Sequence, residues 1–325
     1  MGVTEKQAAE TSQFHINFVG IRHIGYAVSV ISFVAAVCLL YFWGLTYGVE
    51  FAGGSVFHYR FKGAVDENTI RATLSTPAFA DLGDVQVQRV MGAMEAAGQA
   101  AGQEYIIKSK FEEHIAKGVA ADEVETRMDK ALSAIGGGAE RLSVEKIGPT
   151  VGATLKVKAF WCAFLGCLGI LLYIALRFEF RMAVAAIVAE VHDCFLILGI
   201  FALLRHEFTL DILAALLTIL GYSINDSIIV LDRVRENLRL KRKLGFDEIV
   251  NLSINQTLGR TIMTSVTVQL SVLALLFIGP SNVRDFALAM TIGIVVGTYS
   301  SIFVVAPILV DWYYKDHPAV QQKLA

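Results

Sequence analysis

Long apolar runs separated by short polar connections dominate the chain. A bilayer core ~30 Å thick needs about 20 apolar residues per helical span. Six stretches meet this requirement: 24–43, 157–176, 182–204, 208–231, 261–279 and 286–310. The first exceeds the ~7–15 apolar residues of a signal peptide and no small-residue cleavage site follows it, so we expect an uncleaved anchor. The pattern predicts a polytopic α-helical membrane protein, with residues 1–23 and 311–325 as terminal segments and 157–310 as a bundle of helices 2–6.

Residues 44–156, between the first two spans, have a different pattern. This segment carries 15 acidic and 12 basic side chains, which is ordinary for a folded domain outside the membrane. Alternating apolar and polar positions predict strands, and a helical period predicts helices. The expected elements are a strand over 49–62, a helix over 66–76, strands over 84–91 and 104–110, a helix over 112–135 and a strand over 141–147. This β-α-β-β-α-β order is typical of a ferredoxin-like α+β domain. Residues 91–103, rich in Gly and Ala, are expected to form a hairpin loop.

Positive charge predicts the orientation of the spans. Cytoplasmic loops carry an excess of Lys and Arg. The connection 232–259 carries six such residues: Arg233, Arg235, Arg239, Lys241, Arg242 and Lys243. The turns 205–209 and 280–285 each carry only one. We therefore expect both termini to be cytoplasmic and residues 44–156 to lie outside, in the periplasm of a bacterium.

Composition supports the membrane assignment and narrows the function. The chain of 325 residues is 55% apolar and 18% charged, against about 25% charged in soluble proteins. Its net charge of −2 gives no support for a nucleic-acid partner. The sequence contains no Walker A, GxSxG or HExxH motif. We expect neither a cofactor nor a metal site, and a transport subunit rather than an enzyme.

Asp226 and Arg260 are ionisable residues within the spans. Such residues cost ~2.5–3.5 kcal/mol on insertion scales and often mark ion or proton pathways. Asp226 lies about five residues from the cytoplasmic end of its predicted span, or ~8 Å from it. Arg260 begins the next span, at a comparable depth on the same cytoplasmic side. An Asp whose Arg partner can approach and retreat could load and release a proton. A static ion pair that only fixes helix packing is the alternative.

A second polar group lies in the third predicted span. Glu190 and Asp193 are three residues apart and share a helix face, whereas His192 points about 100° away from Asp193. This group is either a second proton station or a polar cluster that holds helices together. In the last span, Gly293-x-x-x-Gly297 is a small-xxx-small pattern that allows close helix approach.

Six ordered motifs resemble one family over nearly the whole chain. These segments resemble the SecF members of the SecD/SecF family, the smaller membrane subunits of the bacterial SecD–SecF accessory complex, within the wider RND superfamily of proton-driven exporters. GYSINDSIIVLDRVREN is the most specific. The motifs are GVEFAGGS (48–55), EKIGPTVGATL (145–155), RFEFRMAVAAIVAEVHD (177–193), GYSINDSIIVLDRVREN (221–237), LGRTIMTS (258–265) and FALAMTIGIVVGTYSSIF (286–303).

The resemblance implies a function and a set of partners. The implied function is coupling of the proton-motive force to late-stage preprotein export across the inner membrane. The implied partners are SecD, the SecYEG channel, SecA and the translocating preproteins. Matching the motifs places the family's membrane aspartate at Asp226 and its arginine at Arg260, and its His-Asp pair at His192 and Asp193.

The chain departs from the family pattern at two positions, and two other functions compete with the implied one. The family usually has Asp at the position of Glu50, and a glycine-rich turn where this chain has Pro280. One alternative function is half of an RND-type exporter of small molecules or lipids. The other is a scaffold that only stabilises the translocon.

Overall fold

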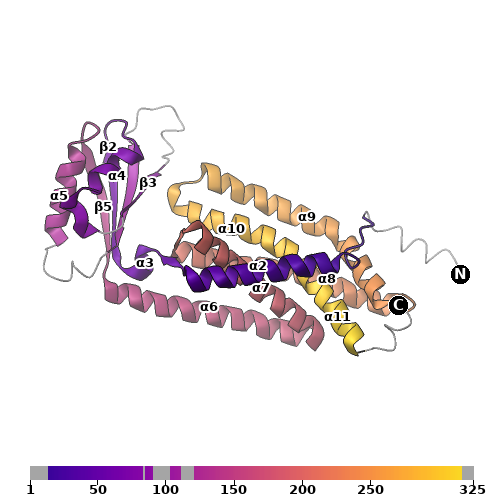
Figure 1. Cartoon of the computed structure of the whole chain (residues 1–325). Coiled ribbons are helices and arrows are strands. Elements are labelled where there is room, and N and C mark those ends of the chain that lie inside the picture. Colours follow the sequence, from indigo (N-terminus) through magenta and orange to yellow (C-terminus); the bar gives the residue numbers. More distant parts are fainter. Residues whose placement is uncertain (1–13, 83–84, 91–102, 111–120, 317–325) are drawn as a thin grey trace.

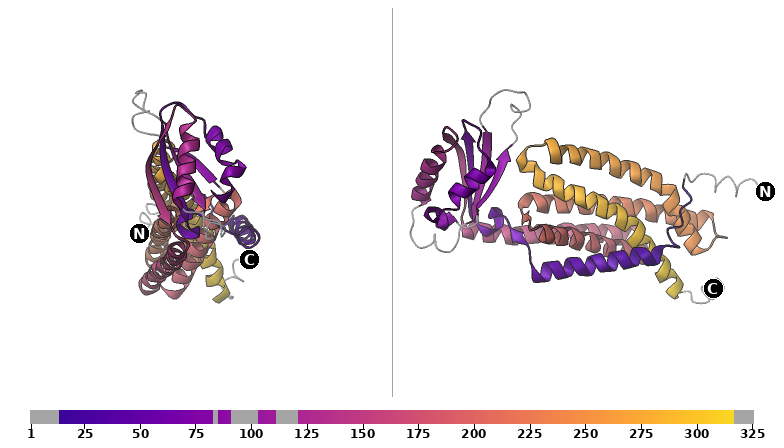
Figure 2. Two further views of the ribbon diagram at one scale, coloured as in Figure 1. Left: turned by 90° about the vertical axis from the view of Figure 1, so that its left-hand side faces the viewer. Right: turned by 45° about the horizontal axis from the view of Figure 1, so that its top comes forward.

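The chain forms a long helical bundle with a sheet domain at one end (Figures 1 and 2). The computed structural model describes residues 14–82, 85–90, 103–110 and 121–316. The predicted loop over 91–103 lies almost entirely outside the described residues. Helix α2 begins, and α11 ends, at the end of the bundle opposite the sheet domain (Figure 1). Both described ends of the chain therefore lie on the side away from the sheet.

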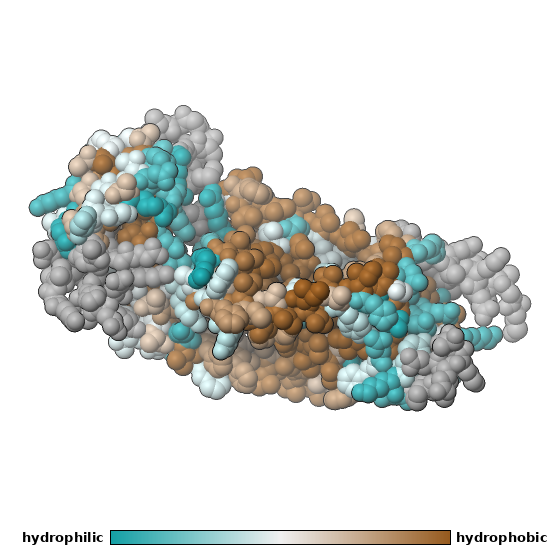
Figure 3. All heavy atoms as spheres, in the orientation of Figure 1, coloured by the Kyte–Doolittle hydropathy of each residue, from teal (hydrophilic) through white to brown (hydrophobic). Residues whose placement is uncertain are grey.

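Six helical segments of the described chain are long and apolar enough to cross a membrane, as the sequence predicts. On the face shown in Figure 3, apolar side chains cover the middle of the bundle and hydrophilic surfaces lie at its two ends. The protein is therefore a multi-pass membrane protein. The segments are α2 (Arg22–Phe42), α6 (Pro149–Arg177), α7 (Phe180–Leu204), α8 (Leu210–Leu240), α9 (Phe246–Ile278) and the continuous run of α10 (Ser281–Ser300), the π-helical turn η3 (Ser301–Val305) and α11 (Ala306–Asp316).

The helices extend well beyond the apolar runs that predicted them. Residues 232–259 were expected to form a loop, but α8 continues to Leu240 and α9 begins at Phe246, which leaves only a short turn. The polar ends of these two helices pack on each other, and Asn237 Nδ2 donates to Ser253 Oγ at 2.8 Å. The sequence prediction missed these polar helix ends because hydropathy detects only the apolar part of a helix. Arg233, Arg235 and Arg239 of this connection accordingly lie on α8.

The sheet domain has the predicted β-α-β-β-α-β order. Its antiparallel strands lie in the order β3-β4-β2-β5, which is the ferredoxin-like arrangement. The first predicted strand is wrong at its start, because residues 49–52 form the short helix α3 instead. The elements are α3 (Val49–Ala52), β2 (Gly54–Phe61), α4 (Glu67–Leu74), η1 (Pro77–Leu82), β3 (Val85–Val90), β4 (Gln103–Lys110), α5 (Ala121–Ser133) and β5 (Ala139–Ile147).

Both helices of this domain pack on one face of the sheet. Alternate residues of β2, Phe57, Tyr59 and Phe61, are at most 2% exposed and contact the same core as Ile70 of α4 and Met128 of α5. Burial of apolar area at about 25 cal/mol per Å² drives this packing. Tyr59 Oη donates to Asp129 Oδ1 of α5 at 2.8 Å. Burial, together with this hydrogen bond to a carboxylate, raises the pKa of Tyr59.

A small parallel sheet attaches the domain to the bundle. Strand β1 (Thr46–Tyr47), which follows α2, pairs with β6 (Glu207–Phe208) in the turn between α7 and α8. Gly48 N donates to Phe208 O at 3.0 Å, and the Phe51 ring stacks on that of Phe208. The segment that leads from α2 into the sheet domain is thus joined to the connection between α7 and α8.

Glu50 lies within this junction. It is half-buried, and its Oε2 has no hydrogen-bond partner among the described residues. Burial raises the pKa of the Glu50 carboxyl, against the opposing effects of a hydrogen bond from its own backbone and of Lys108 on β4, and the acidic groups of Glu207 and Asp211 add smaller effects in the raising direction. The junction therefore favours the protonated form of Glu50.

Candidate proton-relay site in the membrane bundle

Asp226 is completely buried in the middle of α8. Its exposure is 0%, and neither carboxylate oxygen has a hydrogen-bond partner among the described residues. Helix α8 continues 14 residues beyond Asp226 to Leu240, about 21 Å at 1.5 Å per residue, so Asp226 lies far from either end of its helix. A carboxyl group at this depth cannot reach water by extending its side chain. It must be protonated, or be supplied with a partner.

Hydroxyl groups from three helices surround this carboxyl. Ser265 of α9 interacts with Asp226, accepts a hydrogen bond from Tyr222 Oη at 3.2 Å, and lies 2.8 Å from Thr298 Oγ1 of α10. The buried hydroxyls of Ser227 and Thr261 have no partner in the described part of the chain. Such groups can donate to an ionised carboxylate or accept from a protonated one. The site can therefore accommodate both states of Asp226.

Arg260 lies in the interior of α9, and not at the start of a span as predicted. It acts electrostatically on Asp226, but it forms no salt bridge with any carboxylate among the residues that the structure describes. Its side chain is exposed and lines a cavity of about 620 Å³ together with Phe14, Gln256 and Met263. The closed ion pair that was the alternative prediction is therefore absent from this described arrangement.

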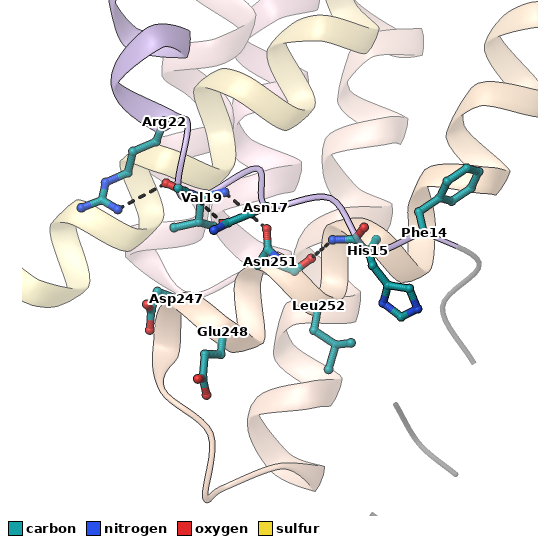
Figure 4. Close-up of a pocket in the computed structure, with 11 residues that line it drawn as sticks. Phe14, His15, Asn17, Val19, Arg22, Asp247, Glu248, Asn251 and Leu252 are labelled. Carbon is teal, nitrogen blue, oxygen red and sulfur yellow. Dashed lines mark hydrogen bonds between the residues drawn. The ribbon is translucent and has the colours of Figure 1, made fainter. Parts of the chain in front are cut away.

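The segment before α2 is bound to α9 next to this cavity. Asn255 accepts from Ile16 N and donates to Ile16 O, both at 2.8 Å. One turn away, Asn251 Oδ1 accepts from Phe18 N at 2.8 Å. Figure 4 shows Asn251 directed at the segment, beside a pocket of about 440 Å³. In the sequence, the only sign of this contact is the pair Asn251 and Asn255, four residues apart. The pair does not indicate which segment of the chain it binds.

Glu190, His192 and Asp193 form a second buried cluster around α7. Asp193 is 0% exposed, and its Oδ2 accepts from Ser223 Oγ of α8 at 2.7 Å and Ser300 Oγ of α10 at 2.6 Å. His192 Nδ1 lies 3.0 Å from Asp193 Oδ1. Ser223 lies three residues before Asp226 on α8, but its hydroxyl bonds to Asp193. Ser300 was not predicted.

The matching family model spans helices α6 to α10, nearly all of α11 and part of the sheet domain. It is described as "Protein export membrane protein SecD/SecF, C-terminal", and it matches residues 127–315. This range covers more than half of the chain, and it contains both Asp226 and Arg260. The resemblance read from the six motifs is thereby confirmed.

Relatives match nearly the whole chain. A protein translocase subunit SecDF from Thermus thermophilus is 41% identical over 298 residues, which cover 91% of this chain and 38% of that protein. A SecF from Desulfurispirillum indicum is 37% identical over 94% of this chain and 95% of its own length. A SecF from Pseudomonas aeruginosa is 34% identical over 91% of this chain and 90% of its own length. The chain thus spans about two fifths of the SecDF protein but nearly all of the separate SecF proteins.

Solved structures share the fold. A crystal structure of SecDF from Thermus thermophilus, described as a translocon-associated membrane protein, matches with a TM-score of 0.76 at 36% identity, over 93% of this chain and 39% of that chain. A crystal structure of SecDF in a super-membrane-facing form matches with a TM-score of 0.70 at 37% identity, over 96% and 40%. On the family model, the relatives and the shared fold, this chain belongs to the SecD/SecF family of protein export membrane proteins and is a SecF-type member of it.

Proposed function

We propose that the chain is the subunit of the Sec translocase that couples the proton-motive force to late-stage preprotein export, working with SecD, the SecYEG channel and SecA. Its relatives bear the name protein translocase subunit. The observation that carries the proton role is the completely buried carboxyl of Asp226, without a hydrogen-bond partner and without a salt bridge to the arginine of the next helix.

Two states of Asp226 provide the coupling. In the first, the carboxyl is protonated and neutral and needs no counter-charge. In the second, it is ionised and the guanidinium of Arg260, which stays charged, moves toward it. One charge moved through 100 mV contributes about 2.3 kcal/mol, and since ~1.4 kcal/mol is a tenfold change, each proton biases the equilibrium by roughly 50-fold. This bias is sufficient to drive a movement of the external domain.

SecD is proposed to cover the exposed face of α9. This face presents Arg260 beside large apolar side chains, including Met263 at 71% and Leu270 at 63% exposure. A buried charge facing lipid would be costly, whereas a partner helix can cover Arg260 and enclose the 620 Å³ cavity. The fused SecDF relative is much longer than this chain, which supports a second, separate half as the partner.

The proposed orientation places the sheet domain outside. Three arginines on the end of α8 and three basic residues in the turn to α9 lie at the end of the bundle far from the sheet domain. Under the positive-inside rule this end is cytoplasmic. The domain is then positioned where preproteins emerge, and the edge strands β3 and β5 of its sheet offer contacts to extended polypeptide.

Preprotein export into inner-membrane vesicles tests the function. Asp226→Asn holds the site neutral, so the complex should assemble, export slowly at its late stage and lose its dependence on the proton gradient. Arg260→Met should produce the same phenotype and Asp226→Glu should retain partial activity. Asp211→Asn, which removes an exposed carboxylate at the start of the same helix, is the control. Normal, gradient-dependent export by Asp226→Asn would refute the proposal.

A further inference from the structure

The cluster around α7 contains two buried carboxyl groups in unlike surroundings. Glu190 is 4% exposed and Asp193 is 0% exposed, and they lie one helical turn apart. Asp193 accepts hydrogen bonds from Ser223 and Ser300 and contacts the His192 ring. Both oxygens of Glu190 are buried and have no hydrogen-bond partner among the described residues. The two acids are therefore not equivalent.

We propose that Glu190, His192 and Asp193 form a second proton-binding site of the bundle, in which Glu190 carries the proton and Asp193 carries the charge. Several donors suit an ionised carboxylate, whereas a buried carboxyl without donors is best accommodated when it is neutral. Two neighbouring carboxyls that share a buried site cannot both be ionised, so the pair holds one proton. This inference does not depend on the role proposed for Asp226.

In the described part of the chain, neither carboxyl forms a salt bridge with an Arg or a Lys. The basic group paired with Asp193 is the imidazole of His192, whose nitrogen lies within the 4.0 Å limit for a salt bridge. The other titratable groups that face the cluster come from several helices. They are Cys167 of α6, Cys194 of α7, Tyr26 of α2 and, beyond Ser223, Asp226 of α8. None of these can supply a positive charge. The site therefore depends on protonation rather than on ion pairing, in contrast to Asp226 and Arg260.

His192 provides a route for the proton. Its Nδ1 faces Asp193, while its Nε2 is buried and has no partner among the described residues. The ring lines a cavity of about 340 Å³ between α2, α7 and the α11 segment, stacked beside Phe33. A second cavity of about 440 Å³ shares Tyr26 and Ile308 with the first and reaches Asp311 near the end of α11. The residues that line the two cavities extend from Asp316 near the end of α11 to His192.

Proton exchange uses these groups and a hydronium ion from solution. The hydronium gives its proton to Nε2 of neutral His192 and leaves as water, and Nδ1 releases its own proton to ionised Asp193 Oδ1. Glu190 and Asp193 then hold two protons between them, and release of either one to water by the reverse route restores the singly protonated pair. The imidazole ring is neutral before and after the transfer, as its two nitrogens exchange roles.

The same cluster is connected to an irregular part of the last span. Ser300, which donates to Asp193, directly precedes the π-helical turn Ser301–Val305. Such turns are frequent at functional sites. A neutral Asp193 would hold the Ser300 hydroxyl less strongly than an ionised one. Transient protonation of Asp193 is therefore coupled to the junction between α10 and η3.

Infrared spectroscopy of the full chain in lipid nanodiscs tests the site. One component of the carbonyl band of protonated carboxylic acids should be present at neutral pH, disappear in Glu190→Gln, and persist in Asp193→Asn and Asp226→Asn. In Glu190→Asp, which keeps a carboxyl group, the band should remain at a shifted frequency. A carbonyl region that neither Glu190 variant changes would overturn the proposal. Because the band is read without a proton gradient, failure of Asp226 as a relay would leave this result intact.

A second measurement tests the route through His192. After transfer into D₂O, the shift of the Glu190 carbonyl band reports how fast its proton exchanges. His192→Gln should slow this exchange several-fold. The matched control is His206→Gln, since His206 lies outside the bundle core and pairs with Asp285 at 3.0 Å. Equal exchange rates in wild type and His192→Gln would exclude the histidine as the route.

Discussion

Gly293 of α10 lies directly against Ile219 of α8. A β-carbon at position 293 would be 2.3 Å from Cδ1 and 2.5 Å from Cγ1 of Ile219. One turn further, a β-carbon at Gly297 would be 2.9 Å from Cβ of Ser223. Close approach at these two glycines brings Ser300 and Ser223 to the same carboxylate, Asp193. The packing of α8 on α10 therefore positions the buried polar groups.

Gly293→Ala should destabilise the bundle. The added methyl group forces α8 and α10 apart or moves Ile219 out of its rotamer, and overpacking of this kind costs about 1–3 kcal/mol. Thermal unfolding in detergent should show a lower Tm. Gly221→Ala is the matched control, because nothing lies within 4 Å of a β-carbon at that position. Equal losses in the two variants would contradict the close contact.

The sequence predicted the spans and the order of the sheet domain, because both depend on local patterns. Hydropathy identified six apolar runs, and alternation identified β2, β3, β4 and β5. The hydropathy prediction failed where helices continue past the membrane. Residues 246–260 of α9 carry polar groups such as Asn251 and Asn255, whose role is to bind the segment before α2. Arg260 was consequently placed at a helix start.

The site was predicted in its residues but not in its contacts. Asp226 and Asp193 were identifiable because an acid in an apolar run is unusual. Their partners were not, since Ser223 and Asp226 lie three residues apart on α8 and only the packing of α7 and α10 shows that Ser223 donates to Asp193. The absence of a salt bridge at Arg260 likewise depends on distances between helices. Sequence periodicity does not contain such distances.

Glu50→Gln should change how stability depends on pH. Burial raises the pKa of Glu50 in the folded chain, so the folded state binds this proton more tightly than the unfolded state. The contribution of Glu50 to stability is fully present below the ordinary glutamate pKa of ~4.3 and is lost as the pH rises through the raised folded value. Between mildly acidic and neutral pH, the Tm of the wild type should therefore fall relative to that of Glu50→Gln. Glu145→Gln, at an exposed position of β5, should follow the wild type. Parallel profiles for all three would refute this effect.

Asn255→Ala should release the segment before α2. The substitution removes two hydrogen bonds to the Ile16 backbone, each contributing about 0.5–1.5 kcal/mol. Hydrogen exchange of a peptide covering residues 14–20 should become faster. Met263→Ala removes a 71% exposed side chain from the same helix and should leave this exchange unchanged. No difference between the two variants would show that Asn255 does not hold the segment.

Cysteine labelling should establish the orientation. With Cys38, Cys162, Cys167 and Cys194 replaced, single cysteines would be introduced at Glu140 on β5 and at Lys243 in the turn after α8. In spheroplasts, a membrane-impermeant maleimide should label position 140 directly and position 243 only after permeabilisation. The physical basis is the excess of basic residues around the second position. The reverse pattern would overturn the proposed topology.

Proton flux through reconstituted complexes of the chain with SecD tests the central proposal most directly. A pH-sensitive dye inside the liposomes would follow proton entry under an imposed gradient, with Asp211→Asn as the control for loss of an unrelated carboxylate. The account predicts flux in wild type and in Asp211→Asn, and its loss in Asp226→Asn, where the buried carboxyl can no longer bind or release a proton. Undiminished flux in Asp226→Asn would contradict it.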